Sequence, residues 1–275
     1  MKDSLYYYNK IPNFGDLLNP FLTKNLFHKE IEYAHPYYAK YYCIGSILEK
    51  MIAEDYNYKK QIKKLFIPSL VVYGSGFIKE QTTTKEYYYR NLDIKAVRGK
   101  YTLQRFAKNL NKKISVELGD PGLLTSLVPF QSEKKFRVGI IPHYVDKNNP
   151  IFTNNRSAIS DSLIIDVSES PEVVISKILS CECILSSAMH GLIVADSFCI
   201  PNRRLIISDQ ITGGDYKFND YYSAFNTEKT VANPIDLRKE NISENIITET
   251  LKDYKVHPEE IQRIQNNLLK VNPFQ

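Results

Sequence analysis

Short apolar runs alternate with helix-like patterns along most of the chain. Each run is followed by a polar or glycine-bearing turn, and then by a segment whose apolar residues recur at helical spacing. This alternation is typical of βα units, in which parallel strands form a sheet and helices cover its faces. The pattern therefore predicts an α/β protein with parallel sheets.

The predicted elements form two successive series. In the first series, strands are predicted at 5–8, 41–44, 70–73, 94–97 and 115–118, with helices beginning near residues 17, 47, 100 and 122. In the second series, strands are predicted at 136–141, 163–167, 183–185 and 204–207, with helices at 171–179 and 189–198. Two amphipathic helices, at 241–254 and 258–269, are predicted to close the chain.

A polar stretch separates the two series. Residues 129–135 begin with proline and show no hydrophobic period, which is typical of a linker. The length of 275 residues suits two domains of ordinary size. We therefore predict an N-terminal domain at 1–130 and a C-terminal domain at 136–275, each of which is Rossmann-like.

Composition narrows the class of protein. Apolar residues at 43% and charged residues at 24% are typical of a soluble globular chain, and the net charge of +5 is modest. That charge suits an anionic ligand, although a solvated surface explains it equally, and we expect no nucleic-acid partner. The 20 tyrosines fit either stacking on sugars or ordinary packing.

The cellular location is inferred from cysteines and apolar runs. Four cysteines lie inside predicted strands or helices, at spacings that match neither a disulfide framework nor a zinc site. The first residues lack an apolar signal region, and no run approaches the roughly 18 apolar residues of a membrane span. We therefore expect a cytoplasmic protein with reduced cysteines and no bound metal.

Candidate functional residues lie in the loops that follow the predicted strands. In parallel sheets, ligands bind at the carboxyl ends of the strands, so these loops are expected to meet at one site. The candidates after the first series of strands are Asn13, Gly15, Asp16, Gly45, Ser46, Gly74, Ser75 and Arg98. Those of the second series are His143, Ser187, Ala188, Met189, His190 and Lys217.

Several of these residues also have a purely structural interpretation. Asp16 is equally explained as a helix N-cap, and the turn that contains Gly74 lacks the full dinucleotide pattern and the Walker lysine. Asp120 is explained as a cap before Pro121. Arg98 offers a guanidinium that could grip a carboxylate or phosphate, but a surface arginine is the common alternative.

The second series gives sharper candidates. His190 is predicted in the first turn of a helix, where free N–H groups favour an anion, although a buried and satisfied histidine has the same pattern. His143 follows the strand 136–141 and is expected to face the same site. Lys217 lies on a loop that starts with glycine, where it is predicted to be a mobile cation for phosphate or an ordinary exposed lysine.

The order of six segments resembles the polysaccharide pyruvyl transferase family. These are Asn-Phe-Gly-Asp (13–16), Gly-Ser-Gly-Phe (74–77), Ala-Val-Arg-Gly (96–99), Gly-Asp-Pro (119–121), Gly-Ile-Ile-Pro-His-Tyr (139–144) and Ser-Ser-Ala-Met-His-Gly-Leu-Ile-Val-Ala-Asp-Ser (186–197). The resemblance spans about residues 6 to 222. The segment around His190 is its most diagnostic part.

The resemblance implies a fold, a donor and an active residue. The fold would be two Rossmann-like lobes similar to GT-B glycosyltransferases, with phosphoenolpyruvate bound in the cleft between them. The second lobe would supply the donor side, the first the acceptor side, and the active histidine of the family maps onto His190. Many members carry Arg-Leu before that histidine, whereas this chain has Ala188 and Met189. A sub-branch with Ala-Met-His carries a patch similar to Lys217-Phe218-Asn219-Asp220. We therefore expect Lys217 and Arg98 to bind the anion.

The implied reaction transfers pyruvate from phosphoenolpyruvate to a pair of sugar hydroxyls during synthesis of a surface polysaccharide, namely capsule, exopolysaccharide or lipopolysaccharide. His190 is expected to be the general acid and to need a neighbouring acid, because a helix N-terminus lowers the pKa of an imidazole. Asp16 would be a base for a hydroxyl. Arg98, Lys217 and the N–H groups of Ser187 and Ala188 would bind the anion, and His143 would bridge acceptor or phosphate. No cofactor or metal is required.

Two other functions remain open from the sequence. One is a glycosyltransferase that uses a nucleotide sugar, because the same architecture serves that chemistry. The other is a sugar-binding protein without catalytic activity. If the acceptor is lipid-linked, the basic segment 59–64 or the N-terminal tyrosines would contact the inner face of the membrane, although a solvated charge run explains the segment equally.

Overall fold

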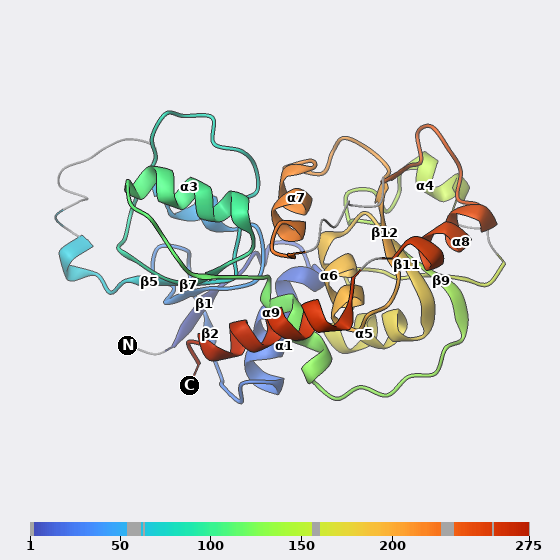
Figure 1. Ribbon diagram of the computed structural model, residues 1–275, viewed down its shortest axis with the longest axis horizontal. Helices are drawn as coiled ribbons and strands as arrows, with labels where there is room; N and C mark the ends of the chain where they lie inside the picture. The colour runs from blue at the N-terminus through green and yellow to red at the C-terminus, as the bar shows by residue number, and fades with distance from the viewer. Residues whose placement is uncertain are drawn as a thin grey trace.

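The protein forms two parallel sheets that lie beside one another, with helices packed around them (Figure 1). The computed structural model describes residues 3–53, 62, 64–155, 160–226, 234–254 and 256–274. Within these residues, parallel strands alternate with helices along the chain. The prediction of an α/β protein with parallel sheets is therefore confirmed.

The first sheet has the strand order β2-β1-β3-β5-β7-β8 within the described residues, and all neighbours in it are parallel. Its strands are β1 (Ser4–Tyr6), β2 (Glu32–Tyr33), β3 (Tyr41–Tyr42), β5 (Leu70–Tyr73), β7 (Leu92–Val97) and β8 (Glu117–Leu118). A separate antiparallel pair, β4 (Ile52–Ala53) with β6 (Tyr87–Tyr88), was not predicted.

The second sheet has the order β10-β9-β11-β12-β13 among the described residues, again with parallel neighbours. Its strands are β9 (Phe136–Ile141), β10 (Ser162–Ile164), β11 (Cys181–Ser186), β12 (Asn202–Ile206) and β13 (Ile235–Asp236). The central strands β9 and β11 each end in four buried residues, Val-Gly-Ile-Ile and Cys-Ile-Leu-Ser, as strands covered on both faces require. The short edge strand β13 was missed.

The helices match the predicted series with informative exceptions. The α-helices are α1 (Phe14–Asn25), α3 (Lys100–Leu110), α4 (Pro150–Asn155), α5 (Pro171–Leu179), α6 (Met189–Ser197), α7 (Tyr216–Tyr222), α8 (Glu244–Asp253) and α9 (Pro258–Lys270). The segments predicted as helices from residues 47 and 122 are 3₁₀ turns instead, η1 (Leu48–Met51) and η3 (Pro121–Leu127), and a third such turn is η2 (Lys64–Phe66). Lys217 was expected on a loop, but it lies on α7.

The two ends of the chain cross between the sheets. Helix α1 packs against α5 and α6, and its residues Phe14 and Leu18 share a core with Ile165 and Val174 of the second half. Helix α9 returns to the first sheet, where the Tyr73 hydroxyl donates to the Leu268 carbonyl at 3.0 Å. These contacts join the two halves, and the division at residues 130–136 stays a prediction.

The structure bears on two expectations about membranes, namely the absence of a membrane-spanning segment and a surface contact of the basic segment. No helix in the described part of the chain is long and apolar enough to cross a membrane. The basic segment 59–64 lies outside the described residues apart from Ile62 and Lys64, so the predicted contact of this segment with a membrane surface stays a prediction.

Candidate active site

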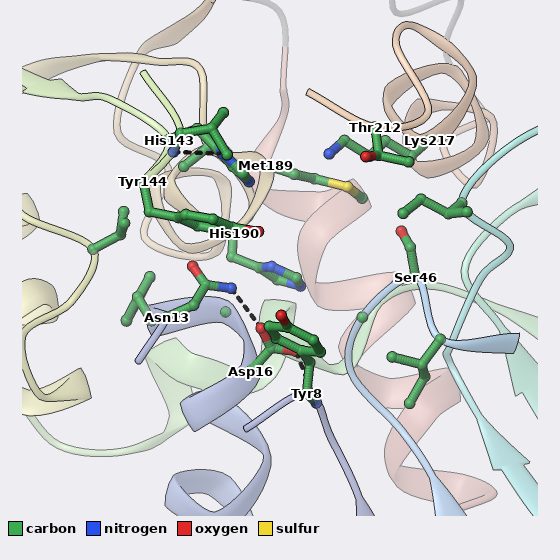
Figure 2. Close-up of a pocket in the computed structure, with 18 of the residues that line it drawn as sticks. Tyr8, Asn13, Asp16, Ser46, His143, Tyr144, Met189, His190, Thr212 and Lys217 are labelled. Atoms are coloured by element: carbon green, nitrogen blue, oxygen red, sulfur yellow. Dashed lines mark hydrogen bonds between the residues drawn. The ribbon is translucent and has the colours of Figure 1, made fainter. Parts of the chain in front are cut away.

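A cavity of about 390 Å³ lies where the carboxyl ends of strands from both sheets meet. Its wall is built from loops that follow β1, β3, β9 and β11, together with α7. Figure 2 shows how side chains from these loops point into it. Ten of the predicted site residues line the cavity, namely Asn13, Gly15, Asp16, Gly45, Ser46, His143, Ala188, Met189, His190 and Lys217.

Asp16 lies in the first turn of α1, on the cavity wall. The Asn13 amide donates to its Oδ2 at 2.6 Å, and the backbone N–H of Tyr8 donates to its Oδ1 at 3.3 Å (Figure 2). Burial raises the pKa of this carboxyl, while the Asn13 amide and the nearby His190 favour its charged form. The carboxyl is therefore held in place beside the imidazole and has a raised affinity for a proton.

His190 lies in the first turn of α6 and packs directly on Gly15. A Cβ atom at Gly15 would lie 2.0 Å from His190 Nδ1, so a glycine is needed for the ring to occupy this position. The opposite nitrogen, Nε2, is buried and has no hydrogen-bond partner among the described residues. It lies 3.7 Å from Oδ2 of Asp120. The ring is thus fixed between a glycine and a carboxylate.

Asp120 is the acidic neighbour that the His190 hypothesis required. It is fully buried, and its Oδ1 accepts from the N–H of Gly122 at 2.9 Å, as the predicted cap does. Its Oδ2 accepts no hydrogen bond among the described residues and faces His190. Cap and ion-pair roles therefore coexist in one side chain, and the sequence indicated only the first.

Lys217 supplies positive charge at another part of the cavity wall. It is almost fully buried on α7, and no carboxylate lies within ion-pair distance of it in the described part of the chain. Burial, together with the nearby positive charges of Arg98 and Arg204, lowers the pKa of this lysine to about 8. A buried cation without a protein counter-ion attracts an anionic ligand.

His143 stands near Lys217 and is neutral. Burial and the charge of Lys217 lower its pKa to about 4. Its Nδ1 accepts from the N–H of Val145 at 3.4 Å, which leaves the proton on Nε2 as a donor. Its own backbone N–H donates to the Ser187 hydroxyl at 2.8 Å. His143 is therefore a fixed hydrogen-bond donor beside the lysine (Figure 2).

The start of α6 adds backbone donors, although not the ones predicted. The N–H of Ser187 donates to the Ile141 carbonyl, and that of Ala188 donates to the Ser186 hydroxyl, both at 3.0 Å. These two groups are therefore occupied. No side chain caps the helix, so the N–H groups of its first turn, at Met189 and His190, are the ones left for an anion.

Four predicted contact residues are not part of the cavity lining. Arg98 is fully buried behind the wall, where its guanidinium donates to Asp220, Ser46 and the Phe77 carbonyl. The Ser75 hydroxyl donates to the Gly45 carbonyl at 2.8 Å. Gly74 adopts a left-handed φ of 79° against Pro121, and Ser187 is fully buried. These residues shape the loops, and their geometry does not favour contact with a ligand in this cavity.

Other lining residues were not among the predicted site residues, although the N-terminal tyrosines and a segment that ends at Tyr144 were noted in the sequence. They include the aromatic rings of Tyr8 and Tyr144 and the polar side chains of Glu49, Gln210 and Thr212. The sequence signal that could have identified them as site residues is their position in loops that follow strands. Tyr8 follows β1, and Tyr144 follows His143 in the loop after β9. Aromatic faces beside polar groups form a surface that suits a saccharide.

Comparisons with known proteins agree with this geometry. A family model described as polysaccharide pyruvyl transferase matches residues 3–208. An uncharacterized protein of Acanthamoeba polyphaga mimivirus is 29% identical over 238 residues, which cover 82% of this chain and 75% of that protein. The succinoglycan biosynthesis protein ExoV of Rhizobium meliloti (strain 1021) is 26% identical over 226 residues, 78% of this chain and 62% of its own length. The chain belongs to the polysaccharide pyruvyl transferase family.

Proposed function

We propose that this protein transfers a pyruvyl group from phosphoenolpyruvate to two hydroxyls of a saccharide, forming a cyclic ketal. The observation that carries the proposal is the pairing of two kinds of chemistry in one cavity. A buried lysine that lacks an acidic partner among the described residues lines the same cavity as a carboxylate and an imidazole, Asp16 and His190. The family to which the chain belongs supports pyruvylation of a polysaccharide.

Phosphoenolpyruvate has two anionic groups, a phosphate and a carboxylate, and both need partners. The Lys217 ammonium, the Nε2–H of His143 and the N–H groups at the start of α6 are the donors we assign to them. Lys217 supplies the charge that many relatives are expected to supply from an arginine before the active histidine. The donors come from three different elements, so they approach the anion from several sides.

His190 is the general acid in this proposal. Protonated His190 donates a proton to the methylene carbon of phosphoenolpyruvate, with the Asp120 carboxylate facing its Nε2. The methylene becomes a methyl group, and positive charge develops on the carbon that bears the phosphate and the carboxylate. Asp120 stabilises the imidazolium before the transfer, and the contact with Gly15 holds the ring in one orientation.

Asp16 is the base for the acceptor. It takes the proton of one sugar hydroxyl, whose oxygen bonds to the cationic carbon. The bond from this carbon to the phosphate oxygen then breaks, and phosphate leaves with its electron pair and the proton held by Asp16. The second hydroxyl gives its proton to the neutral His190 and closes the ring, so both side chains return to their starting states. The products are one pyruvate ketal and one inorganic phosphate, so the proposed reaction consumes no further reactant.

The acceptor binds, we suggest, against Tyr8 and Tyr144, whose rings flank the region of Asp16. Their faces suit the C–H surface of a sugar. We propose a surface polysaccharide, or its lipid-linked precursor at the inner face of the membrane, as the acceptor.

The test follows both substrates. The purified protein is incubated with phosphoenolpyruvate and a panel of saccharide acceptors, while phosphorus NMR follows phosphate and mass spectrometry follows the sugar. We expect inorganic phosphate to appear only with an acceptor, whose mass grows by one pyruvate less one water. Sugar addition from a nucleotide-sugar donor, without turnover of phosphoenolpyruvate, would replace the proposal by glycosyl transfer.

A further inference from the structure

Asp220 joins α7 to the N-terminal end of α3 through a buried network. Its Oδ2 accepts from Arg98 Nε at 2.9 Å and from the Thr102 hydroxyl at 2.7 Å, and its Oδ1 accepts from the Thr102 N–H at 2.9 Å. Arg98, Thr102 and Asp220 are all fully inaccessible to solvent. The Asp220 carboxylate of α7 therefore accepts hydrogen bonds from the first turn of α3, a helix far away in the sequence.

Gly99 allows the two backbones to meet. Its φ of −162° is ordinary extended backbone, so conformation does not require glycine at this position. A Cβ atom here, however, would lie 1.7 Å from the carbonyl oxygen of Asp220 and 2.6 Å from the Ser223 hydroxyl oxygen. That hydroxyl also accepts from the Lys100 N–H at 2.7 Å. Residues 98–102 thus form a socket for the end of α7.

The socket is connected to the cavity through two residues of the cavity lining, Lys217 and Ser46. Lys217 lies three residues before Asp220 on the same helix, and residues at this spacing lie on neighbouring parts of one helix face. Arg98 also donates to the Ser46 hydroxyl at 2.5 Å, and Ser46 lines the cavity. The ion pair between Arg98 and Asp220 therefore fixes α7 relative to the opposite wall of the cavity.

We infer that Arg98, Gly99, Thr102 and Asp220 are positioning residues that hold α7 so that Lys217 reaches the anion in the cavity. The inference rests on the anion-binding role proposed for Lys217. It replaces the predicted direct contact of Arg98 with the substrate by an indirect one. None of these four residues touches the reacting atoms.

A charge-sensitive readout separates this role from a loss of stability. The charged groups that act on Lys217 are the cations Arg98 and Arg204, which are themselves paired with Asp220 and Asp215. Lys217 in turn lowers the pKa of the neighbouring His143. Burial beside the two cations lowers the pKa of Lys217 to about 8. A lysine displaced into water regains an ordinary pKa near 10.4, so the pH dependence of anion binding reports where Lys217 lies.

The experiment compares variants by calorimetric titration with phosphoenolpyruvate, and separately with inorganic phosphate, across the pH range around 8. Asp220→Asn removes the charge from the socket, and Gly99→Ala keeps every charge but pushes α7 away. Lys217→Ala is the reference for complete loss of the cation, and Asn219→Ala changes an exposed neighbour on the same helix. Circular dichroism confirms that each variant is folded.

We expect Asp220→Asn and Gly99→Ala to weaken phosphoenolpyruvate binding by about 10-fold or more, toward the value of Lys217→Ala, and to lose the decline in affinity near pH 8. Asn219→Ala should behave like the unaltered protein. The inference would be overturned if Lys217→Ala binds weakly but a folded Gly99→Ala keeps the affinity and the pH dependence of the unaltered protein. If Lys217→Ala itself binds normally, the proposed role of Lys217 fails instead.

Discussion

The cavity has two chemically different ends. Around His190, the carboxyl groups of Asp16 and Asp120 flank the imidazole, so a proton gained by the ring would face negative charge on both sides. Around Lys217 the neighbours are cations or neutral, and no carboxylate of the described residues pairs with it. The first end holds groups that can gain and lose a proton, whereas the second holds a cation without a counter-ion among the described residues. This difference is the basis for the proposed division into a proton-transfer end and an anion-binding end.

The largest effect is expected at the proton-transfer end. His190→Ala removes the general acid, so turnover should fall by about 10² to 10⁴-fold, while the Kd for phosphoenolpyruvate changes only a few-fold. Phosphate release measures the first quantity and calorimetry the second. His35→Ala, at an exposed histidine, is the matched control. Turnover within a few-fold of the unaltered protein would remove His190 from the mechanism.

Lys217→Ala should have the opposite signature at the anion-binding end. Loss of a charge-assisted hydrogen bond weakens phosphoenolpyruvate binding by roughly 10- to 100-fold. Turnover at saturating donor should change less, because His190 and Asp16 are untouched. Titration calorimetry provides the measurement, with Lys79→Ala at an exposed lysine as the control. Equal weakening by both variants would mean that general charge, and not this position, attracts the donor.

Asp120→Asn tests the carboxylate behind the imidazole. Asparagine keeps an oxygen for the N–H of Gly122, so the cap survives while the charge opposite His190 Nε2 is lost. We expect turnover to fall roughly 10-fold with no change in the KM for phosphoenolpyruvate, as for other partners that orient an active imidazole. If Asp120→Asn changes the thermal unfolding temperature but not turnover, Asp120 acts only as a helix cap and has no role in catalysis.

A smaller effect is expected from pH. The charged form of Lys217 binds the anion, so affinity is fully present below its pKa of about 8 and is lost as the pH rises through that value. His143 stays neutral over this range, because burial lowers its pKa to about 4. Calorimetry at a series of pH values should show the decline in the unaltered protein and none in Lys217→Ala. A decline that persists in Lys217→Ala would point to another titrating group.

The sequence predicted best the elements that are continuous apolar runs. Strands β5 and β9 were predicted with their exact bounds, because β5 is a wholly buried apolar run and β9 ends in the buried residues Val-Gly-Ile-Ile. The loops after such strands were predicted as the site, and ten of the candidate residues do line one cavity. Helix α7 was missed because its seven residues, Tyr-Lys-Phe-Asn-Asp-Tyr-Tyr, show no clear helical period. Its position depends on tertiary contacts.

Arg98 and Asp120 show what local sequence leaves out. Arg98 has the features of a substrate-binding arginine, but its partner Asp220 lies 122 positions further along the chain. Asp120 has the features of a cap, and its second role appears only when α6 brings His190 within 3.7 Å. In both cases the deciding contact is between residues distant in sequence, so residue type and spacing could not reveal it.

The most direct test of the central claim is a titration of the purified protein with phosphoenolpyruvate beside a panel of nucleotide sugars. We expect saturable binding of phosphoenolpyruvate that weakens in Lys217→Ala and persists in His190→Ala, with no comparable binding of any nucleotide sugar. Binding of a nucleotide sugar in the same cavity, with none of phosphoenolpyruvate, would contradict pyruvyl transfer and favour glycosyl transfer.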